Sequence, residues 1–256
     1  MEPIKNKSLS MQAKDSILDY IKTINLDETT KLPSEENLAQ LLGVSRITIR
    51  SALNDLASDG VLFRRHGKGT FINKEALKLK TSLSPTSEIT DIIKSSGFIP
   101  KIKLLSCTKL IANQKISEAL DIPKKSDIIE IKKIFYANDT PCIYSIDYIS
   151  SDLLPTLNDF EELQKYESSI YKFIYEKYSE RIEWDNAHIT TTTNIEDTNL
   201  NTIFNCNNSV KSFLVVEGIN YNSNDKAILF SIEYIDTKFI SFNEIRKKNM
   251  YQNKIF

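Results

Sequence analysis

The sequence predicts an α+β protein composed of two domains. Its 256 residues exceed the usual size of a single hydrophobic core. Apolar residues recur at helical spacing as far as Asp59, whereas from Ile102 onward they alternate with polar residues as they do in strands. We therefore expect a small, mainly helical domain at 8–73, a linker at 74–87, and a larger domain at 88–246 built around an antiparallel sheet.

Composition favours a folded, cytoplasmic protein. Hydrophobic residues make up 41% of the chain and charged residues 26%, which is enough apolar material for real cores. No stretch approaches the roughly 20 apolar residues of a membrane span. The cysteines Cys107, Cys142 and Cys206 are far apart and odd in number, which argues against a disulfide framework and a paired-cysteine zinc site. We expect no membrane association, no metal and no cofactor.

The charge is unevenly distributed along the chain. The formal net charge is only -1, but residues 1–80 hold 13 Lys and Arg against 10 Asp and Glu, while the remaining residues hold 20 against 24. Between Ser45 and Lys74 there are six cations and two acids. A local excess of this kind is suited to neutralising the phosphates of a nucleic acid.

Three helices are predicted in the N-terminal domain. Each starts at a serine that can cap it and continues with apolar residues on one stripe. They run from Ser10 to Ile24, from Ser34 through Leu42, and from Ser45 to about Asp59. The second helix is expected to bury Leu38, Leu41 and Leu42.

The last two of these helices have the spacing of a helix-turn-helix. That motif needs a small residue where the helices cross, a glycine in the turn, and apolar residues after it. The residues that meet these requirements are Ala39, Gly43, Val44 and Ile49. The outward positions near the start of the third helix are Ser45, Arg46, Ile47, Thr48 and Arg50. Arginine can bridge N7 and O6 of guanine, so Arg46 is the strongest candidate for reading a base.

A strand, a glycine-flanked turn and a second strand follow the third helix. The strands are predicted at Val61–Arg65 and Thr70–Ile72. The tip between them is cationic and lacks obstructing side chains, so it can approach the DNA backbone or minor groove. We predict DNA contacts from Arg65, His66, Gly67 and Lys68. A basic helix often only exposes its charges to solvent. Here the strand-turn-strand segment, which we call the wing, and the local charge together favour DNA binding.

The N-terminal segments together form a recognisable pattern. They are Leu32-Pro33-Ser34-Glu35, Gly43-Val44-Ser45-Arg46-Ile47-Thr48-Ile49-Arg50, Ala52-Leu53, Leu56, Asp59-Gly60 and Gly67-Lys68-Gly69-Thr70-Phe71-Ile72. This pattern resembles the GntR family of bacterial regulators from Ser10 to Asn73. The resemblance implies DNA contacts at Ser45, Arg46, Thr48, Arg50, His66 and Gly67. Glu36 departs from it, because several members have an arginine there; this glutamate either reads a cytosine amine or stays solvated.

The C-terminal domain is predicted to mix short helices with antiparallel strands. Helices are expected at Glu88–Ser96, Gln114–Leu120, Ser169–Tyr178 and Glu196–Phe204. Strands are expected at Ile102–Cys107, Ile128–Tyr136, Cys142–Ile149, Ile182–Thr192, Ser212–Tyr221 and Ala227–Ile235. Hairpin turns are expected at Asn138-Asp139 and from Asn222 to Asp225.

Several segments of this domain also resemble a known family. They are Gly97-Phe98-Ile99-Pro100, Ala119-Leu120, Asp139-Thr140-Pro141, Ser168-Ser169-Ile170-Tyr171 and the strand from Ser231 to Phe239. They are similar to the UTRA ligand-binding domain of the HutC subfamily, whose fold is like that of chorismate lyase. In members that bind phosphosugars, the matching positions hold the phosphate; here they are Lys133, Phe135, Ser169 and Tyr171. An acidic position of the family is Ser145 here, and Glu233 on the last strand is a secondary candidate.

The resemblance implies an effector site at Lys133, Ser145, Ser169, Tyr171 and Glu233, suited to a phosphorylated sugar or another anion. The alternative interpretation is structural: Lys133 as a surface cation, Tyr171 as a core aromatic and Ser169 as a helix cap. Together these features favour a cytoplasmic transcriptional regulator, most simply a repressor, that binds an inverted-repeat operator as a homodimer and responds to a small molecule.

Two other functions compete with this hypothesis. One is an enzyme with a chorismate lyase-like domain fused to a DNA-binding head. No catalytic residue stands out, because His66 and His188 lack a neighbouring metal or acid cluster, and His188 is expected to be half-buried in a strand. The other is a structural nucleic-acid binder without a sensor, which the long apolar C-terminal part argues against.

Overall fold

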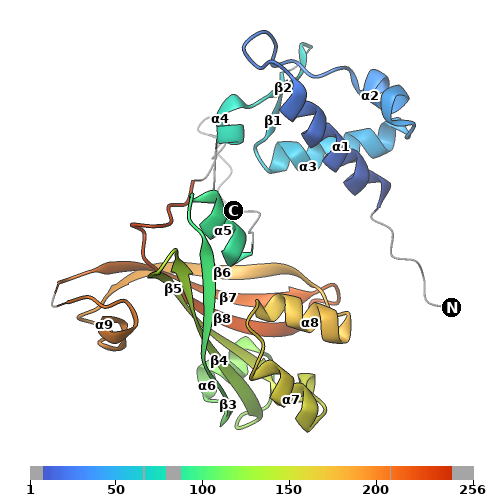
Figure 1. Ribbon diagram of the computed structural model, residues 1–256. Helices are drawn as coiled ribbons and strands as arrows, with labels where there is room; N and C mark the ends of the chain where they lie inside the picture. Colours follow the sequence, from blue (N-terminus) through green and yellow to red (C-terminus); the bar gives the residue numbers. More distant parts are fainter. Residues whose placement is uncertain (1–7, 66, 79–87, 208, 244–256) are drawn as a thin grey trace, which may run out of the picture. The chain divides into compact units, whose positions relative to one another are not determined.

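The computed structural model describes residues 8–65, 67–78, 88–207 and 209–243 (Figure 1). Contacts divide these residues into two compact units, one of residues 8–78 together with 242–243 and the other of residues 88–241. The smaller unit carries helices and a short hairpin, and the larger unit carries a six-stranded sheet. This is the α+β architecture that the sequence predicts.

The helices of the smaller unit are α1 (Leu9–Thr23), α2 (Glu35–Leu42) and α3 (Arg46–Ser58). A serine hydroxyl caps each of them by accepting a hydrogen bond from a backbone N–H in the first turn; the caps are Ser8, Ser34 and Ser45. The first helix therefore begins earlier than predicted, because Ser8 and not Ser10 is its cap. Gly43 ends α2 in the left-handed conformation, at φ +64°, which is the turn that the motif requires.

The core of the smaller unit lies between α1 and α3. Ile17, Ile21, Ile49 and Leu53 are at most 1% exposed there. The prediction that Leu41 is buried was wrong, since its side chain is 71% exposed. At 100° per residue the inward arc of α2 includes positions 38, 39 and 42, and position 41 falls outside it.

The wing is a sheet of β1 (Leu62–Arg65) and β2 (Gly69–Ile72). A segment before α2 adds to its edge, because Lys31 forms a bridge with Phe71. The N–H of Leu32 donates to the carbonyl of Thr70 at 3.0 Å, which supports the same edge. The sequence did not predict this third segment. Helix α4 (Lys74–Lys78) lies inside the predicted linker, so the first part of that linker is helical and not irregular.

The larger unit is built on one antiparallel sheet with strand order β3-β4-β5-β8-β7-β6. The strands are β3 (Pro100–Ile111), β4 (Asp127–Ala137), β5 (Thr140–Ser150), β6 (Ile182–Thr193), β7 (Ser212–Asn222) and β8 (Ala227–Ile235). All six were predicted, with ends that differ by up to four residues. Both predicted hairpin turns contain a left-handed residue, Asn138 at φ +57° and Asp225 at φ +56°.

Helices cover both faces of the sheet. They are α5 (Ile89–Ser95), α6 (Gln114–Ala119), α7 (Leu157–Leu163), α8 (Ile170–Tyr178) and α9 (Asn199–Ile203), with a 3-10 turn at Ser151–Leu153. Helices α7 and α8 pack against Ile129 and Ile131 of β4, whereas α6 and α9 pack against Ile128 and Ile134 of the same strand. Because strand side chains alternate, these two pairs of helices lie on opposite faces (Figure 1).

Two local predictions in the larger unit need correction. Helix α7 was not predicted, although Thr156 and Asp159 form a capping box at its start. The helix predicted at Glu196–Phe204 is shorter, because Glu196 accepts hydrogen bonds from Thr193 in a turn and regular helix starts only at Asn199. None of the helices in the described ranges is long and apolar enough to span a membrane. The three cysteines are buried and unpaired.

Candidate functional site

The first turn of α3 presents an exposed polar surface. Arg46 and Ile47 are exposed, and Ile47 reaches 81%. The hydroxyl of Ser45 accepts from the Thr48 N–H at 3.1 Å and lies 2.8 Å from the Thr48 hydroxyl. Within the described residues no ion pair or hydrogen bond restrains the Arg46 guanidinium, so this side chain can reach out from the helix.

Arg50 is held differently from Arg46. Its guanidinium donates two hydrogen bonds to one carboxylate oxygen of Glu35, at 3.1 and 3.0 Å. Arg64 of the wing pairs with the other oxygen of Glu35 at 3.4 Å. Glu35 therefore links α3 to the wing, and the Arg50 side chain remains 57% exposed beside Arg46. Neighbouring Glu36 is exposed, with no partner among the described residues.

The wing supplies further cations. The Arg65 guanidinium lies over the rings of Phe63 and Phe71, at 5.0 and 4.8 Å from their centroids. Lys68 is exposed in the tip turn. Gly67 is left-handed at φ +69°, which explains the glycine there. His66 lies outside the described residues.

A lysine that the sequence analysis did not single out lies beside the wing. Lys31 is exposed, and a Cβ placed on Gly69 would come within 3.1 Å of its side chain. Lys31 thus adds a cation to those of β1 and the tip. Its contact is between distant segments, so neither its spacing nor its sequence neighbours reveal it.

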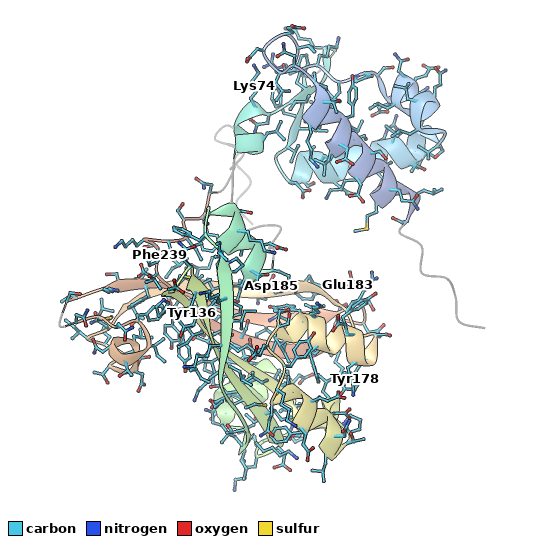
Figure 2. The ribbon with its side chains drawn as sticks, in the orientation of Figure 1. Lys74, Tyr136, Tyr178, Glu183, Asp185 and Phe239 are labelled. Carbon is cyan, nitrogen blue, oxygen red and sulfur yellow. The ribbon has the colours of Figure 1, made fainter. Side chains whose placement is uncertain are left out.

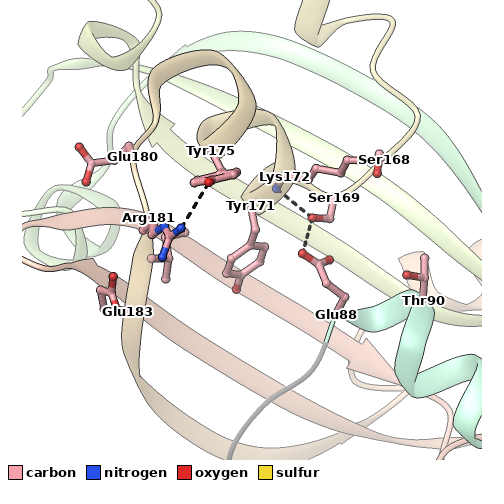
Figure 3. Close-up of a pocket in the computed structure, with 11 residues that line it drawn as sticks. Glu88, Thr90, Ser168, Ser169, Tyr171, Lys172, Tyr175, Glu180, Arg181 and Glu183 are labelled. Atoms are coloured by element: carbon pink, nitrogen blue, oxygen red, sulfur yellow. Dashed lines mark hydrogen bonds between the residues drawn. The ribbon is translucent and has the colours of Figure 1, made fainter. Parts of the chain in front are cut away.

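The larger unit contains a cavity of about 650 Å³, a size suited to a small metabolite. Its wall combines the start of α5, the start of α8 and the first residues of β6 (Figure 3). The charged and polar groups that line it include Glu88, Ser169, Tyr171, Lys172, Arg181 and Glu183.

The N-terminus of α8 is the best defined feature of this cavity. Ser169 caps the helix by accepting from the Lys172 N–H at 3.2 Å. The same hydroxyl donates to the carboxylate of Glu88 at 2.9 Å (Figure 3). A helix N-terminus carries partial positive charge and favours anions, so this part of the wall suits a negatively charged group.

Lys133 lies behind the cavity wall. It is 1% exposed, and its ammonium group donates to the carbonyl of Ser168, which lines the cavity. Burial lowers the pKa of Lys133, while the nearby carboxylate of Asp147 acts in the opposite direction. The alternative of a surface cation is therefore wrong. Lys133 thus supports the cavity wall through Ser168 and is not itself a lining residue.

Carboxyl groups gather next to Lys133 on the face of the sheet that α8 covers. Register pairs Lys133 with Ser145 and Ser145 with Glu233 in one row across β4, β5 and β8. Burial raises the pKa of Glu233 to about 8, and Asp147 and Asp185 add to the shift. Burial also raises the pKa of Asp147 to about 6, although Lys133 and a hydrogen bond from Ser145 lower it.

Tyr171 connects this carboxyl group cluster to the cavity. It lines the cavity, and its hydroxyl donates to the side-chain oxygen of Asn220 at 2.9 Å. Asp185 of β6 (Figure 2) lies beside the same residues, because a Cβ on Gly218 would meet Asp185 at 3.5 Å and Asn220 at 3.6 Å. Tyr171 is therefore a wall residue with a fixed hydroxyl, and not a purely apolar core aromatic.

The raised pKa of Glu233 gives a testable pH dependence. Its pKa rises from 4.5 to about 8 on folding. Between these two pH values the folded state therefore holds a proton that the unfolded state has lost. This contribution to the free energy of unfolding is complete below about pH 4.5 and disappears as the pH rises to about 8. Glu233→Gln should make the stability of the larger unit less dependent on pH and higher near pH 8.

Urea unfolding followed through the fluorescence of Trp184, the only tryptophan, measures this effect. The matched control is Glu161→Gln, at an exposed position on α7. We expect the control to keep the wild-type slope of stability against pH. An unchanged slope in Glu233→Gln would show that Glu233 is ionised in the folded protein throughout.

Of the predicted effector residues, the structure brings Ser169 and Tyr171 into the cavity wall. Lys133, Ser145 and Glu233 lie next to one another on the sheet, behind the lining residues. Glu88, Lys172 and Arg181 were not predicted from the sequence as cavity residues. Lys172 follows the predicted helix cap and could have been found from it, whereas Glu88 and Arg181 reach the cavity only through tertiary structure. His188 is exposed on β6, not half-buried as predicted.

The fold and these surfaces define a class of protein. A helix-turn-helix with an exposed first turn and a cationic wing is a DNA-binding unit, and here it precedes an α+β unit with a cavity. Comparison with known proteins agrees with both parts. The model "Bacterial regulatory proteins, gntR family" matches residues 9–72, and the model "UTRA domain" matches residues 95–240. The chain belongs to the gntR family and carries a UTRA domain.

Individual relatives support this assignment, and a solved structure shares the fold. The HTH-type transcriptional regulator YurK of Bacillus subtilis is 37% identical over 59% of this chain and 62% of its own length. The HTH-type transcriptional repressor NagR of the same species is 31% identical over 66% of both chains. The chain thus matches about two thirds of the length of these relatives. The crystal structure of YydK from Bacillus subtilis has the same fold, with a TM-score of 0.71, 22% identity and coverage of 94% of this chain and 100% of YydK.

Proposed function

We propose that this chain is a transcriptional repressor that binds an inverted-repeat operator as a homodimer and releases or engages it in response to a small molecule. The observation that carries the proposal is the exposed Arg46 at the start of α3, beside a cationic wing. Base contacts are assigned to Arg46, and Ser45, Thr48 and Arg50 are assigned to the DNA next to it. Backbone contacts are assigned to Gly67, Lys68, Arg65 and, in addition, His66.

Dimerisation is proposed because one smaller unit (the DNA-binding head) makes too few contacts with DNA for useful specificity. Two-fold symmetry doubles the number of these contacts. Strand β6 supports a dimer surface on the larger unit. It is an edge strand of the sheet, and its side chains are exposed for most of its length. Trp184 and Ile189 are 47% and 41% exposed on it, and a second copy would cover them.

The effector is proposed to bind in the cavity, with an anionic group at the start of α8. Ser169 and Lys172 support the anion, and Tyr171 shapes the wall. The name of NagR describes a repressor, and we extend that role to this chain. The same relatives favour a regulator over an enzyme, and we place the protein in the cytoplasm, where its DNA is.

The test is selection of DNA from a random pool by the full chain, followed by affinity and sedimentation measurements on the selected sequence. We expect an inverted repeat with half-sites one helical turn or a multiple of it apart, bound by two chains. A thermal-shift screen of metabolites then identifies ligands of the cavity, since a bound ligand stabilises the folded state. A monomer both free and on the selected DNA, or selection of no common sequence, would contradict the proposal.

A further inference from the structure

The carboxylate of Glu88 is bound at the N-terminal end of a helix that is not its own. Glu88 is the N-cap residue of α5, yet its side chain makes no capping hydrogen bond to that helix. It accepts a hydrogen bond of 2.9 Å from Ser169, the cap of α8, 81 residues further along the chain (Figure 3). The cavity wall at this point therefore contains a negatively charged group supplied by the protein.

The surroundings of this carboxylate are those of an anion site. Helix α8 has nine residues, and its positive end faces the Glu88 side chain. The ammonium group of Lys133 interacts electrostatically with Glu88, and Lys172 lines the same cavity. A phosphate or carboxylate of an effector would seek the same hydroxyl and the same positive potential, so it competes directly with Glu88.

The position of Glu88 in the chain gives this competition a consequence. Glu88 opens the larger unit, and residues 79–87 connect it in sequence to the DNA-binding unit. When the Glu88 side chain is displaced, the start of α5 loses its contact with α8. This is the point in the sequence where the connecting segment ends. The contact is also weak enough to be displaced, because Glu88 is an exposed residue and water competes for its carboxylate.

From these contacts we propose that Glu88 is an internal pseudo-ligand. Its carboxylate occupies the position that an anionic group of the effector would bind, which we call the anion seat. The effector's phosphate or carboxylate displaces the Glu88 carboxylate and thereby releases the start of α5. This proposal rests on the proposed function, because it takes the cavity as the effector site. In the regulator without effector, Glu88 itself therefore occupies the anion seat.

The probe for this proposal is inorganic phosphate, titrated calorimetrically into the full chain. Glu88→Gln and Glu88→Ala are expected to bind phosphate about five- to tenfold more tightly than the wild type, since both remove the competing charge. The matched control is Asp91→Asn, which removes the same charge from the same helix. Asp91 pairs with Lys94 at 3.0 Å and is not a lining residue of the cavity, so the control should bind phosphate as the wild type does.

A second substitution separates the pseudo-ligand from the seat itself. Ser169→Asp keeps a side chain that can cap α8 but adds a negative charge, and it should abolish phosphate binding also in the Glu88→Gln background. If Glu88→Gln leaves the phosphate affinity unchanged while Ser169→Asp abolishes it, the seat is real and the pseudo-ligand is wrong. If no variant binds phosphate, or Ser169→Asp has no effect, the anion seat is wrong as well. Operator affinity, measured on the same proteins, tests the regulator function independently.

Discussion

Replacement of Arg46 by alanine is expected to weaken operator binding by about 1–3 kcal/mol per head, a loss of about 5- to 150-fold at each half-site. Arg46 opens α3 and is exposed, so its guanidinium can form two hydrogen bonds to one guanine. Because this interaction depends on the base, the loss should be large on the selected operator and small on random DNA. Fluorescence anisotropy with both DNAs measures it.

Lys68→Ala is the control for this prediction. Lys68 is exposed in the wing tip and is assigned to the phosphate backbone. Its removal should weaken all sequences to a similar degree and reduce the slope of affinity against salt by about one. Equal losses on operator and random DNA for Arg46→Ala would show that Arg46 also binds only phosphate.

The contrast between Arg46 and Arg50 shows what the sequence could and could not predict about the smaller unit. The serine caps and the turn at Gly43 are local signals, and the structure confirms the helices that they indicate. Both arginines were predicted to contact DNA, however. The ion pair between Arg50 and Glu35 joins residues 15 apart on different helices, and only the packed motif reveals it.

In the larger unit, too, local patterns were predictable from the sequence, whereas contacts between distant segments were not. Alternation of apolar residues predicted every strand, because that pattern is local to each strand. The sheet order is not local: β5 lies next to β8, and this pairing places Ser145 beside Glu233. The contact between Glu88 and Ser169 depends on the same tertiary arrangement. The resemblance to a family identified Ser169 from its motif, but it gave no indication of the group that binds to it.

Ile49→Ala tests whether the two units are energetically separate, and we expect it to destabilise the smaller unit by about 2–5 kcal/mol. Ile49 is 0% exposed in the core between α1 and α3, so truncation leaves a cavity there. Both units contain helices, so only the part of the helical circular dichroism signal that belongs to the smaller unit should shift to lower urea. DNA binding should weaken with it, because the recognition surface is on the same helix.

The position two residues earlier provides a control on the same helix. Ile47 is 81% exposed, so Ile47→Ala removes a similar side chain without a core cavity and should change stability by only about 0.5 kcal/mol. Trp184 lies in β6 of the larger unit and is the only tryptophan, so its fluorescence reports that unit alone. For Ile49→Ala the fluorescence transition should stay at the wild-type urea concentration, while the smaller unit's part of the circular dichroism transition moves to lower urea. A parallel shift of both signals would mean that the head and the larger unit unfold as one cooperative structure, and an effector could then act on the head through shared stability as well as through the start of α5.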